Sequence, residues 1–288
     1  MKEIVVLSGK GGTGKTSVAA SLAMLLPREV VVADCDVDAA NMHLLLDPDI
    51  HCRSDFFSGE LAVINPDLCT LCGECSQICR FEAIEWLNST IRVDSLNCEG
   101  CGYCEIICPT GAITMAPRKS GQLFISETRT GTTMVYAQMD IGAENSGKLV
   151  ARVKQEARSL AEKENKGLIL IDGAPGIGCP VISSLAGADY VILVTEPTVS
   201  GLFDLTRLCE MIKGFRIQTG AIINKCDLNR ENAEELKAFF RSNQIEHLAD
   251  IPYDPRIPLA MSQGKTIVET EPSFKELFQK IWKKIDNR

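Results

Sequence analysis

Short runs of consecutive apolar residues recur along the chain and alternate with longer segments of helical character. Strands buried on both faces of a parallel sheet read as such continuous runs, whereas strands with one exposed face alternate. Strands that alternate with helices indicate crossover units. The pattern therefore predicts an α/β fold with a doubly wound, mostly parallel sheet. The apolar runs lie at 4–7, 30–33, 168–171, 190–194 and 221–223, and the helical segments at 18–26, 148–163 and 202–213.

The regular pattern stops near residue 50 and resumes near residue 148. The first part of this interval contains turn-forming residues, among them Gly59 and Pro66, and a group of cysteines. Two alternating segments around Gly131 then predict a hairpin that closes the interval, with a loop after it. We therefore predict one discontinuous domain formed by 1–50 and 148–288, an inserted domain at 63–117, and a connecting hairpin and loop at 118–147, with the hairpin strands at 123–128 and 132–138 and the loop at 142–147.

The first apolar run leads into a glycine-rich loop, Ser8 to Ser17, which a helical segment follows. In this context the loop is a phosphate-binding P-loop, because its backbone N–H groups and the helix N-terminus surround phosphate oxygens. Lys15 would pair with the β- and γ-phosphates, and the Thr16 hydroxyl would bind Mg²⁺. The residues predicted to bind the nucleotide here are Gly11, Gly12, Thr13, Gly14, Lys15, Thr16 and Ser17.

A second lysine, Lys10, stands directly after the first glycine of this loop. The loop thereby resembles that of the deviant Walker-A ATPases, the group that includes the MinD and ParA partitioning proteins, the Mrp-type cluster carriers and the nitrogenase iron protein. The resemblance implies ATP hydrolysis by a nucleotide-dependent homodimer. It also implies that Lys10 reaches the phosphates bound to the partner subunit. The alternative for Lys10 is a solvated loop lysine.

Three aspartates follow the second apolar run, at the edge where the ligand crevice of a parallel sheet lies. The resemblance makes this segment, Asp34 to Asp38, the family's switch I. It implies that Asp36 orients the attacking water, with Asp38 as the rival candidate. The alternative for each carboxylate is a turn or a helix N-cap.

Asp172 ends the apolar run 168–171 and matches the Mg²⁺-side aspartate of P-loop enzymes. The segment from Asp172 to Gly176 resembles switch II of the same family. Cys179 lies seven residues after Asp172. We expect a small buried cysteine there, and the alternative is a ligand of a cluster that bridges two subunits.

The run 221–223 ends in Asn224-Lys225-Cys226-Asp227. Taken alone this motif recognises guanine in GTPases. The resemblance implies instead that Asn224 hydrogen-bonds adenine, which suits an amide with one donor and one acceptor. It also implies that Pro252 belongs to a second base-contacting loop. We favour ATP, with GTP as the alternative.

Eight of the 13 cysteines fall between residues 69 and 108. They form two runs with the spacing C-x2-C-x2-C-x3-C, offset by 29 residues, and Gly73 and Gly102 match within them. This spacing is the signature of bacterial ferredoxins with two [4Fe–4S] clusters, in which the fourth cysteine of each run ligates the other cluster. The predicted ligand sets are Cys69, Cys72, Cys75 and Cys108 for one cluster and Cys98, Cys101, Cys104 and Cys79 for the other. The alternative is a pair of zinc sites, although structural zinc favours two short pairs separated by a longer loop.

Charge and hydropathy narrow the possible partners and locations. The net charge of −8 argues against nucleic acid as the main partner. The chain has no apolar run long enough for a membrane span and no recognisable signal peptide, which favours the cytoplasm. A stripe of apolar residues at helical spacing, Phe274 to Ile285, predicts a terminal helix that closes the sheet. The alternative is a membrane-binding helix of the MinD kind, and we do not expect membrane contact.

These patterns together predict an ATPase interrupted by a two-cluster ferredoxin domain. We expect a nucleotide-driven dimer switch that is coupled to electron transfer toward an unidentified redox or metallocofactor partner protein. The alternatives are an ATP-dependent factor that assembles or delivers iron–sulfur clusters or other metallocofactors, and a MinD-like positioning ATPase with structural clusters.

Overall fold

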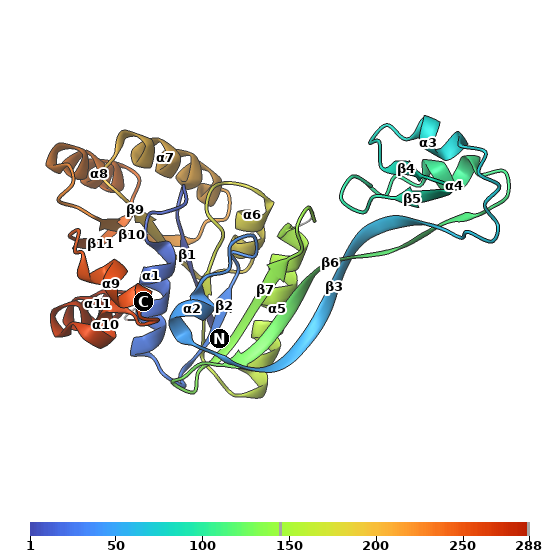
Figure 1. The fold of residues 1–288 in the computed structure, drawn as a ribbon. Helices are drawn as coiled ribbons and strands as arrows, with labels where there is room; N and C mark the ends of the chain where they lie inside the picture. The colour runs from blue at the N-terminus through green and yellow to red at the C-terminus, as the bar shows by residue number, and fades with distance from the viewer. Residues whose placement is uncertain (144–145, 287–288) are drawn as a thin grey trace. The chain divides into compact units, whose positions relative to one another are not determined.

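The computed structural model describes residues 1–143 and 146–286, and the chain divides into two compact units (Figure 1). The first unit comprises Met1–Ser54, Leu123–Gln138 and the chain from Ser146 onward. The second comprises Asp55–Gln122 and a short segment that begins at Met139. The predicted loop at 142–147 includes residues 144 and 145, which lie outside the described residues.

Within the described chain, nine strands form one sheet in the order β11-β10-β9-β1-β8-β2-β7-β6-β3. The pairs that join β11 through to β7 are all parallel. The predicted α/β fold with a mostly parallel, doubly wound sheet is therefore confirmed. The strands are β1 (Lys2–Leu7), β2 (Val30–Asp34), β3 (Asp49–Ile64), β6 (Ile113–Glu127), β7 (Thr133–Met139), β8 (Leu168–Asp172), β9 (Tyr190–Thr195), β10 (Gln218–Asn224) and β11 (Glu246–Ile251).

The hairpin formed by β6 and β7 extends the main sheet. Thr128 N–H donates to the Thr132 carbonyl across the turn at 2.9 Å. β7 then pairs in parallel with β2, with Val32 opposite Met134. Turn signals locate such a hairpin in the sequence, but the strand that it joins lies about a hundred residues away. Both β3 and β6 continue from the first unit into the second.

Helices cover both faces of the sheet (Figure 1). Ile4 and Val6 of β1 pack in one core cluster with residues of α1, α2, α10 and α11. Glu3, on the opposite face of the same strand, binds Lys154 and Arg158 of α5. The helices are α1 (Lys15–Leu25), α2 (Met42–Leu46), α5 (Ser146–Lys163), α6 (Cys179–Leu185), α7 (Val199–Lys213), α8 (Arg230–Ser242), α9 (Arg256–Ser262), α10 (Ile267–Thr270) and α11 (Pro272–Asp286).

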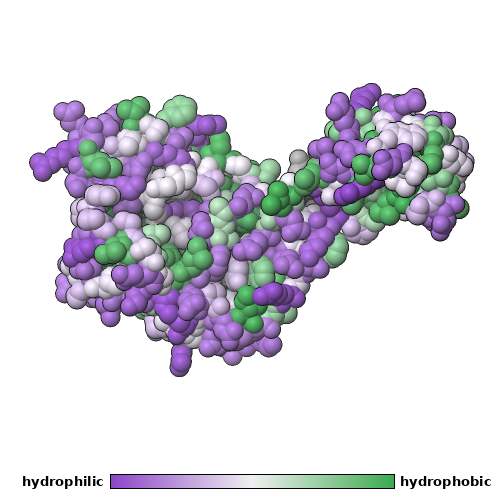
Figure 2. Space-filling view, in the orientation of Figure 1, coloured by the Kyte–Doolittle hydropathy of each residue, from purple (hydrophilic) through white to green (hydrophobic). Residues whose placement is uncertain are grey.

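The second unit is small and contains a duplicated helical motif. Its helices are α3 (Glu74–Ile78) and α4 (Tyr103–Ile107), and its antiparallel hairpin consists of β4 (Ile84–Leu87) and β5 (Thr90–Val93). The core of this unit contains three of the cysteines, Cys75, Cys98 and Cys104. Hydrophobic residues are scattered among hydrophilic ones on the face seen in Figure 2.

The C-terminal helix α11 buries the predicted apolar stripe. Its buried side chains belong to the core cluster that includes α1 and the sheet. The packing agrees with the prediction of a helix that closes one face of the sheet. Among the helices of the described chain, none combines the length and the apolar character that crossing a bilayer requires.

The packing of α11 generates a prediction about stability. Ile281 is fully buried, and replacing it by alanine is expected to lower the free energy of unfolding by about 2–5 kcal/mol, because the cavity left behind collapses only in part. Urea denaturation followed by circular dichroism measures this. Lys283→Ala on the exposed side of the same helix is the control and is expected to change stability by less than about 0.5 kcal/mol. Equal losses for the two variants would contradict the packing.

Candidate functional site

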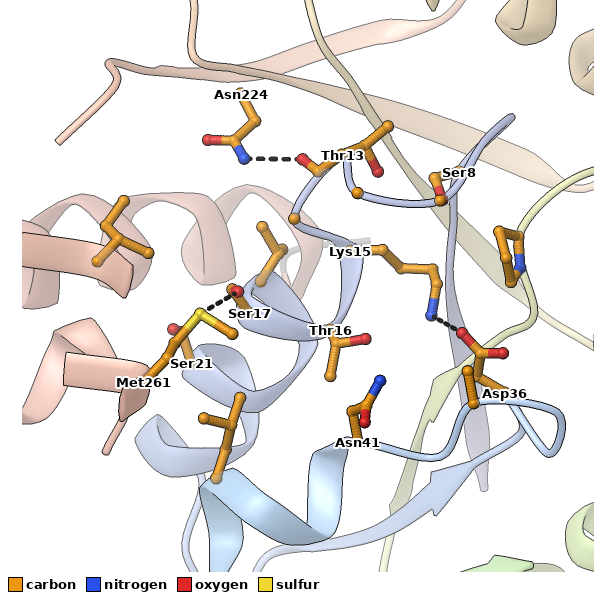
Figure 3. Close-up of a pocket in the computed structure, with 18 of the residues that line it drawn as sticks. Ser8, Thr13, Lys15, Thr16, Ser17, Ser21, Asp36, Asn41, Asn224 and Met261 are labelled. Carbon is orange, nitrogen blue, oxygen red and sulfur yellow. Dashed lines mark hydrogen bonds and ion pairs between the residues drawn. The ribbon is translucent and has the colours of Figure 1, made fainter. Parts of the chain in front are cut away.

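A cavity of about 1100 Å³ lies at the carboxyl ends of the parallel strands in the first unit. The P-loop, the segment after β2, the end of β10 and the loop after β11 all contribute to its wall (Figure 3). Of the predicted site residues, those that line it are Gly11, Gly12, Thr13, Gly14, Lys15, Thr16, Ser17, Asp36, Asp38, Asn224 and Pro252. Two other predicted residues, Asp172 and Lys10, are not among the described residues that line the cavity. Asp172 contacts Nζ of Lys15, and Lys10 contacts Glu196.

The P-loop conformation requires glycine most clearly at position 14. Gly14 has φ +91° and serves as the N-cap of α1. A Cβ atom there would lie 2.3 Å from Nδ2 of Asn224, so both the backbone angle and the close approach favour glycine. The first turn of α1 begins at this point, with Val18 N–H donating to the Gly14 carbonyl at 3.0 Å. The first N–H groups of a helix have no partner within the helix, and the residues of this first turn line the cavity, as an anion site requires.

Lys15 is buried between two carboxylates. Its Nζ lies 2.7 Å from Oδ1 of Asp172 and 3.5 Å from Oδ2 of Asp36. Burial opposes the charge of the ammonium, but the neighbouring carboxylates outweigh it and raise the pKa of Lys15. The lysine therefore stays cationic, as pairing with phosphate requires.

The oxygen atoms around Lys15 suit a magnesium ion. Oδ2 of Asp172 is buried and has no hydrogen-bond partner in the described structure. The Thr16 side chain lines the same cavity, as does Asp36. Mg²⁺ binds in proteins through one or two such oxygens and completes its shell with phosphate and water. The described residues contain no group of three or more His, Cys, Asp or Glu side chains that could by itself hold a metal ion.

Asp34 is a site residue that the sequence analysis did not single out. Its two oxygens accept hydrogen bonds from the backbone N–H groups of Asp36 and Met42, each at 3.1 Å. Burial, and then the charge of Asp172, raise the pKa of Asp34 to about 8. Asp34 therefore fixes the turn that carries Asp36 toward Lys15, whereas Asp38 is exposed at the cavity wall. Its position as the last residue of an apolar strand was the available signal.

Asn224 connects the end of β10 to the P-loop. Its Nδ2 donates to the Thr13 carbonyl at 2.7 Å, and its Oδ1 accepts from Lys225 N–H at 3.0 Å. Asp227, the guanine-reading position of the motif, instead accepts from the backbone N–H of Tyr253 at 2.6 Å. Among the described residues, Asp227 is not part of the cavity wall, whereas Asn224 and Pro252 are.

Lys10 is held by residues at the end of β9 and the start of α7. Its Nζ lies 2.6 Å from Oε1 of Glu196, 2.9 Å from Oγ of Ser200 and 3.4 Å from Oγ1 of Thr198. Oε2 of Glu196 binds Lys225 at 3.1 Å. Glu196 could not be predicted from the sequence, because only the tertiary structure brings it to the P-loop.

In the second unit the two cysteine runs have the same local structure. Gly73 and Gly102 are the N-caps of α3 and α4, with φ of +80° and +72°. Cys79 and Cys108 end these helices in matching extended conformations. Each of these two sulfurs accepts a backbone N–H from the residue four positions later, at 3.4 and 3.3 Å. The duplication seen in the sequence is therefore a structural repeat.

The cysteines of one predicted ligand set share the wall of a single cavity. Cys79, Cys98, Cys101 and Cys104 all line one cavity of about 440 Å³ within the second unit. Of the other set, Cys75 is buried, Cys72 is exposed, and Cys69 and Cys108 are half-buried. Cys179, expected to be buried, is exposed as the first residue of α6, so the expectation of a small buried cysteine was wrong.

Comparison with known proteins finds similar chains over almost the whole length of this one. An uncharacterized protein of Methanocaldococcus jannaschii, MJ0578, is 33% identical over 285 residues, which cover 97% of this chain and 96% of that protein. The uncharacterized ATP-binding protein MJ0547 of the same organism is 23% identical over 275 residues, 93% of this chain and 81% of that protein. The structure of the septum site-determining protein MinD from Pyrococcus horikoshii, complexed with Mg-ADP, superposes with a TM-score of 0.60 at 23% identity. It covers 99% of this chain and 96% of the MinD chain.

This chain also matches a family model. Residues 4–267 match the model of the CobQ/CobB/MinD/ParA nucleotide-binding domain. The match runs through the P-loop, the aspartates at the strand ends and Asn224. The chain therefore belongs to the CobQ/CobB/MinD/ParA family of nucleotide-binding domains.

Proposed function

We propose that this protein binds ATP with Mg²⁺, hydrolyses it as a homodimer, and carries two [4Fe–4S] clusters in its second unit. The observation that carries the ATPase part is the position of Lys15, a buried cation at a helix N-terminus with carboxylates on its far side. Such a group is suited to charge that develops on a transferred phosphoryl group. Family membership supports the same assignment.

The chain's own residues provide the parts that ATP hydrolysis needs. Backbone N–H groups from Gly11 to Thr16 would surround the phosphates. Thr16 and, through water, Asp172 would hold Mg²⁺, which neutralises phosphate charge when bound. Asp36, positioned by Asp34, is the candidate that orients the attacking water, and Asp38 remains the rival.

Adenine is the proposed base. Asn224 and Pro252 line the cavity, and Asp227 is engaged with the Tyr253 backbone. A guanine-specific site would need that carboxylate free to accept from the base. The Mg-ADP bound to the MinD structure supports the same choice.

Lys10 is proposed to act across a dimer interface, as the family's second P-loop lysine does. Lys10→Ala is then expected to bind ATP as the parent chain does and to lower the rate of hydrolysis by about 10²-fold, the size typical for loss of one charge-stabilising donor. Phosphate release and equilibrium nucleotide binding measure the two effects separately.

Two other variants frame this experiment. Lys15→Ala is expected to lose ATP binding and ATP hydrolysis together, because the buried Lys15 ammonium, held near Asp36 and Asp172, would pair with the phosphates. Lys280→Ala, on the exposed side of α11, is the matched control and is expected to match the parent chain. Normal hydrolysis by Lys10→Ala would reject the dimer mechanism.

The cluster assignment rests on the shared cavity and the repeated motif. Thiolate ligands of a cubane cluster each bind a different iron, so they stand around a wide cavity and not around one ion. Backbone N–H donation to Cys79 and Cys108 suits sulfur that carries negative charge. We propose that the predicted domain 63–117 is a ferredoxin domain within the second unit, with the ligand sets given above.

Cluster content provides a direct measurement. The intact protein, isolated anaerobically, is expected to hold roughly eight irons per chain, and Cys79→Ser to lose up to about four of them. Cys52→Ser is the control, because Cys52 is exposed and belongs to neither set. Iron and sulfide analysis with electron paramagnetic resonance reports both. Zinc without iron or sulfide would instead support the alternative of two zinc sites.

The proposed role of the clusters is electron transfer that ATP hydrolysis gates. All eight cysteines belong to the second unit, so each cluster has a full ligand set there. The expected result is reduction by a low-potential donor followed by ATP-dependent reoxidation with a partner protein. Release of labelled iron to an apo-protein would favour the assembly or delivery role instead.

A MinD-like positioning ATPase is the second candidate function. The superposition on MinD over 99% of this chain favours it. In that case the clusters stabilise the second unit without changing redox state during ATP turnover. Electron paramagnetic resonance spectra recorded during ATP turnover separate this positioning role from electron transfer.

A further inference from the structure

The turn of the β6–β7 hairpin is bound to the end of α2. Arg129 in this turn donates a guanidinium N–H to the Leu45 carbonyl, and its backbone N–H donates to the Leu46 carbonyl at 3.2 Å. The last carbonyl groups of a helix have no partner within that helix. Leu45 and Leu46 are buried, where an unpaired carbonyl group is costly. Arg129 therefore supplies hydrogen bonds that α2 cannot make by itself at its C-terminus.

Contacts of this kind matter for α2 because the helix has only five residues. A helix of that length is not stable without tertiary packing, and a cation near its C-terminus is favourable. His43 of α2 stacks on Tyr136 of β7, with ring centroids 5.4 Å apart. Tyr136 stacks in turn on Phe124 of β6, with centroids 4.8 Å apart. The β6–β7 hairpin is thus the support on which α2 lies.

The N-terminal end of α2 is joined to switch I. The backbone N–H of Met42 donates to Oδ2 of Asp34 at 3.1 Å, and the backbone N–H of Asp36 donates to Oδ1 of the same carboxylate. Asn41, directly before α2, and Leu44 line the nucleotide cavity. A displacement of α2 would therefore move the segment that carries Asp36.

Arg129 also connects α2 to α10. Its Nη2 lies 2.9 and 2.8 Å from the two carboxylate oxygens of Glu269. Burial opposes the charge on Glu269, but hydrogen bonds from Arg129 and Thr266 outweigh this and lower its pKa, so the carboxylate stays ionised. Ile267 of α10 lines the nucleotide cavity, as Leu45 of α2 does. One arginine therefore contacts two helices that form part of the cavity wall.

We propose that Arg129 is a positioning residue for ATP hydrolysis, which fixes α2 and, through α2, the switch I carboxylate Asp36. This inference rests on the ATPase function proposed above and adds a dependence on the β6–β7 hairpin. β6 carries the chain back from the second unit. The segment that follows the insertion thereby supports the nucleotide site.

The first test separates the rate of hydrolysis from nucleotide binding. Arg129→Gln removes the charge and shortens the side chain, so it is expected to loosen α2. The rate of hydrolysis at saturating ATP and Mg²⁺ is expected to fall roughly two- to fivefold, the range that corresponds to one cation at a helix C-terminus. The dissociation constant for ADP is expected to stay within about twofold of the parent value, because the P-loop binds the phosphates.

Amide hydrogen exchange provides a second readout, which a loss of overall stability would not reproduce. In Arg129→Gln, exchange is expected to become faster at residues 36–47 and to stay unchanged in β8 and β9, because local opening requires less free energy than global unfolding. Arg129→Lys keeps the charge without the forked geometry and is expected to be intermediate in both measurements. Arg152→Gln is the matched control, because Arg152 is 50% exposed and pairs with Glu156 on its own helix.

Slower hydrolysis by Arg129→Gln, with parent-like ADP binding and faster exchange confined to residues 36–47, supports the proposal. A parent-like rate, or faster exchange throughout the sheet, contradicts the positioning role and leaves the ATPase function standing. If Arg129→Gln does not fold, as judged by thermal unfolding, Arg129→Lys decides, and parent-like exchange at residues 36–47 in that variant rejects the proposal. If the parent chain itself does not hydrolyse ATP, the proposed function fails, and this inference fails with it.

Discussion

The buried contact between Lys15 and Asp172 is the interaction on which the first unit is arranged. Asp172 is fully buried at the end of β8, and Lys15 begins α1, so the contact joins the central strand pair to the first helix. A buried charge pair costs desolvation free energy unless its remaining atoms find partners. Lys15 has a second carboxylate, Asp36, nearby, whereas Oδ2 of Asp172 has no hydrogen-bond partner in the described structure and leaves one acceptor for a bound cation. Asp34 fixes the turn that carries Asp36 toward this pair, because it accepts from the backbone N–H groups of Asp36 and Met42.

The parallel direction of the strands explains why so many segments meet at one cavity. Seven strands from β11 to β7 run parallel, so their carboxyl ends lie at one edge. Asp34, Asp172, Glu196 and Asn224 each stand at or directly after such an end. Parallel strands bring polar residues from distant parts of the chain together there while their apolar residues form the core. The polar contacts among them then connect β9 and β10 to the P-loop.

The insertion of the second unit preserves this sheet. The chain leaves the sheet along β3 and returns to it along β6. β7 then pairs with β2. The inserted residues can therefore have their own core, with cysteines among its buried side chains, without interrupting the pairing that supports the nucleotide cavity. A unit with few large apolar residues in its core is the kind that metal centres commonly stabilise.

The sequence by itself determined the elements whose information is local. Apolar runs predicted the buried strands, the glycine loop predicted the P-loop, and the 29-residue offset indicated the duplication that contains α3 and α4, because each depends on residues close together in the chain. Only the tertiary structure showed that Glu196 holds Lys10, that Asp34 holds switch I, and that Cys179 is exposed. Those facts depend on which strand ends and helix termini become neighbours in the fold. Burial and ion pairing join residues that are far apart in the sequence, so no local sequence pattern predicts them.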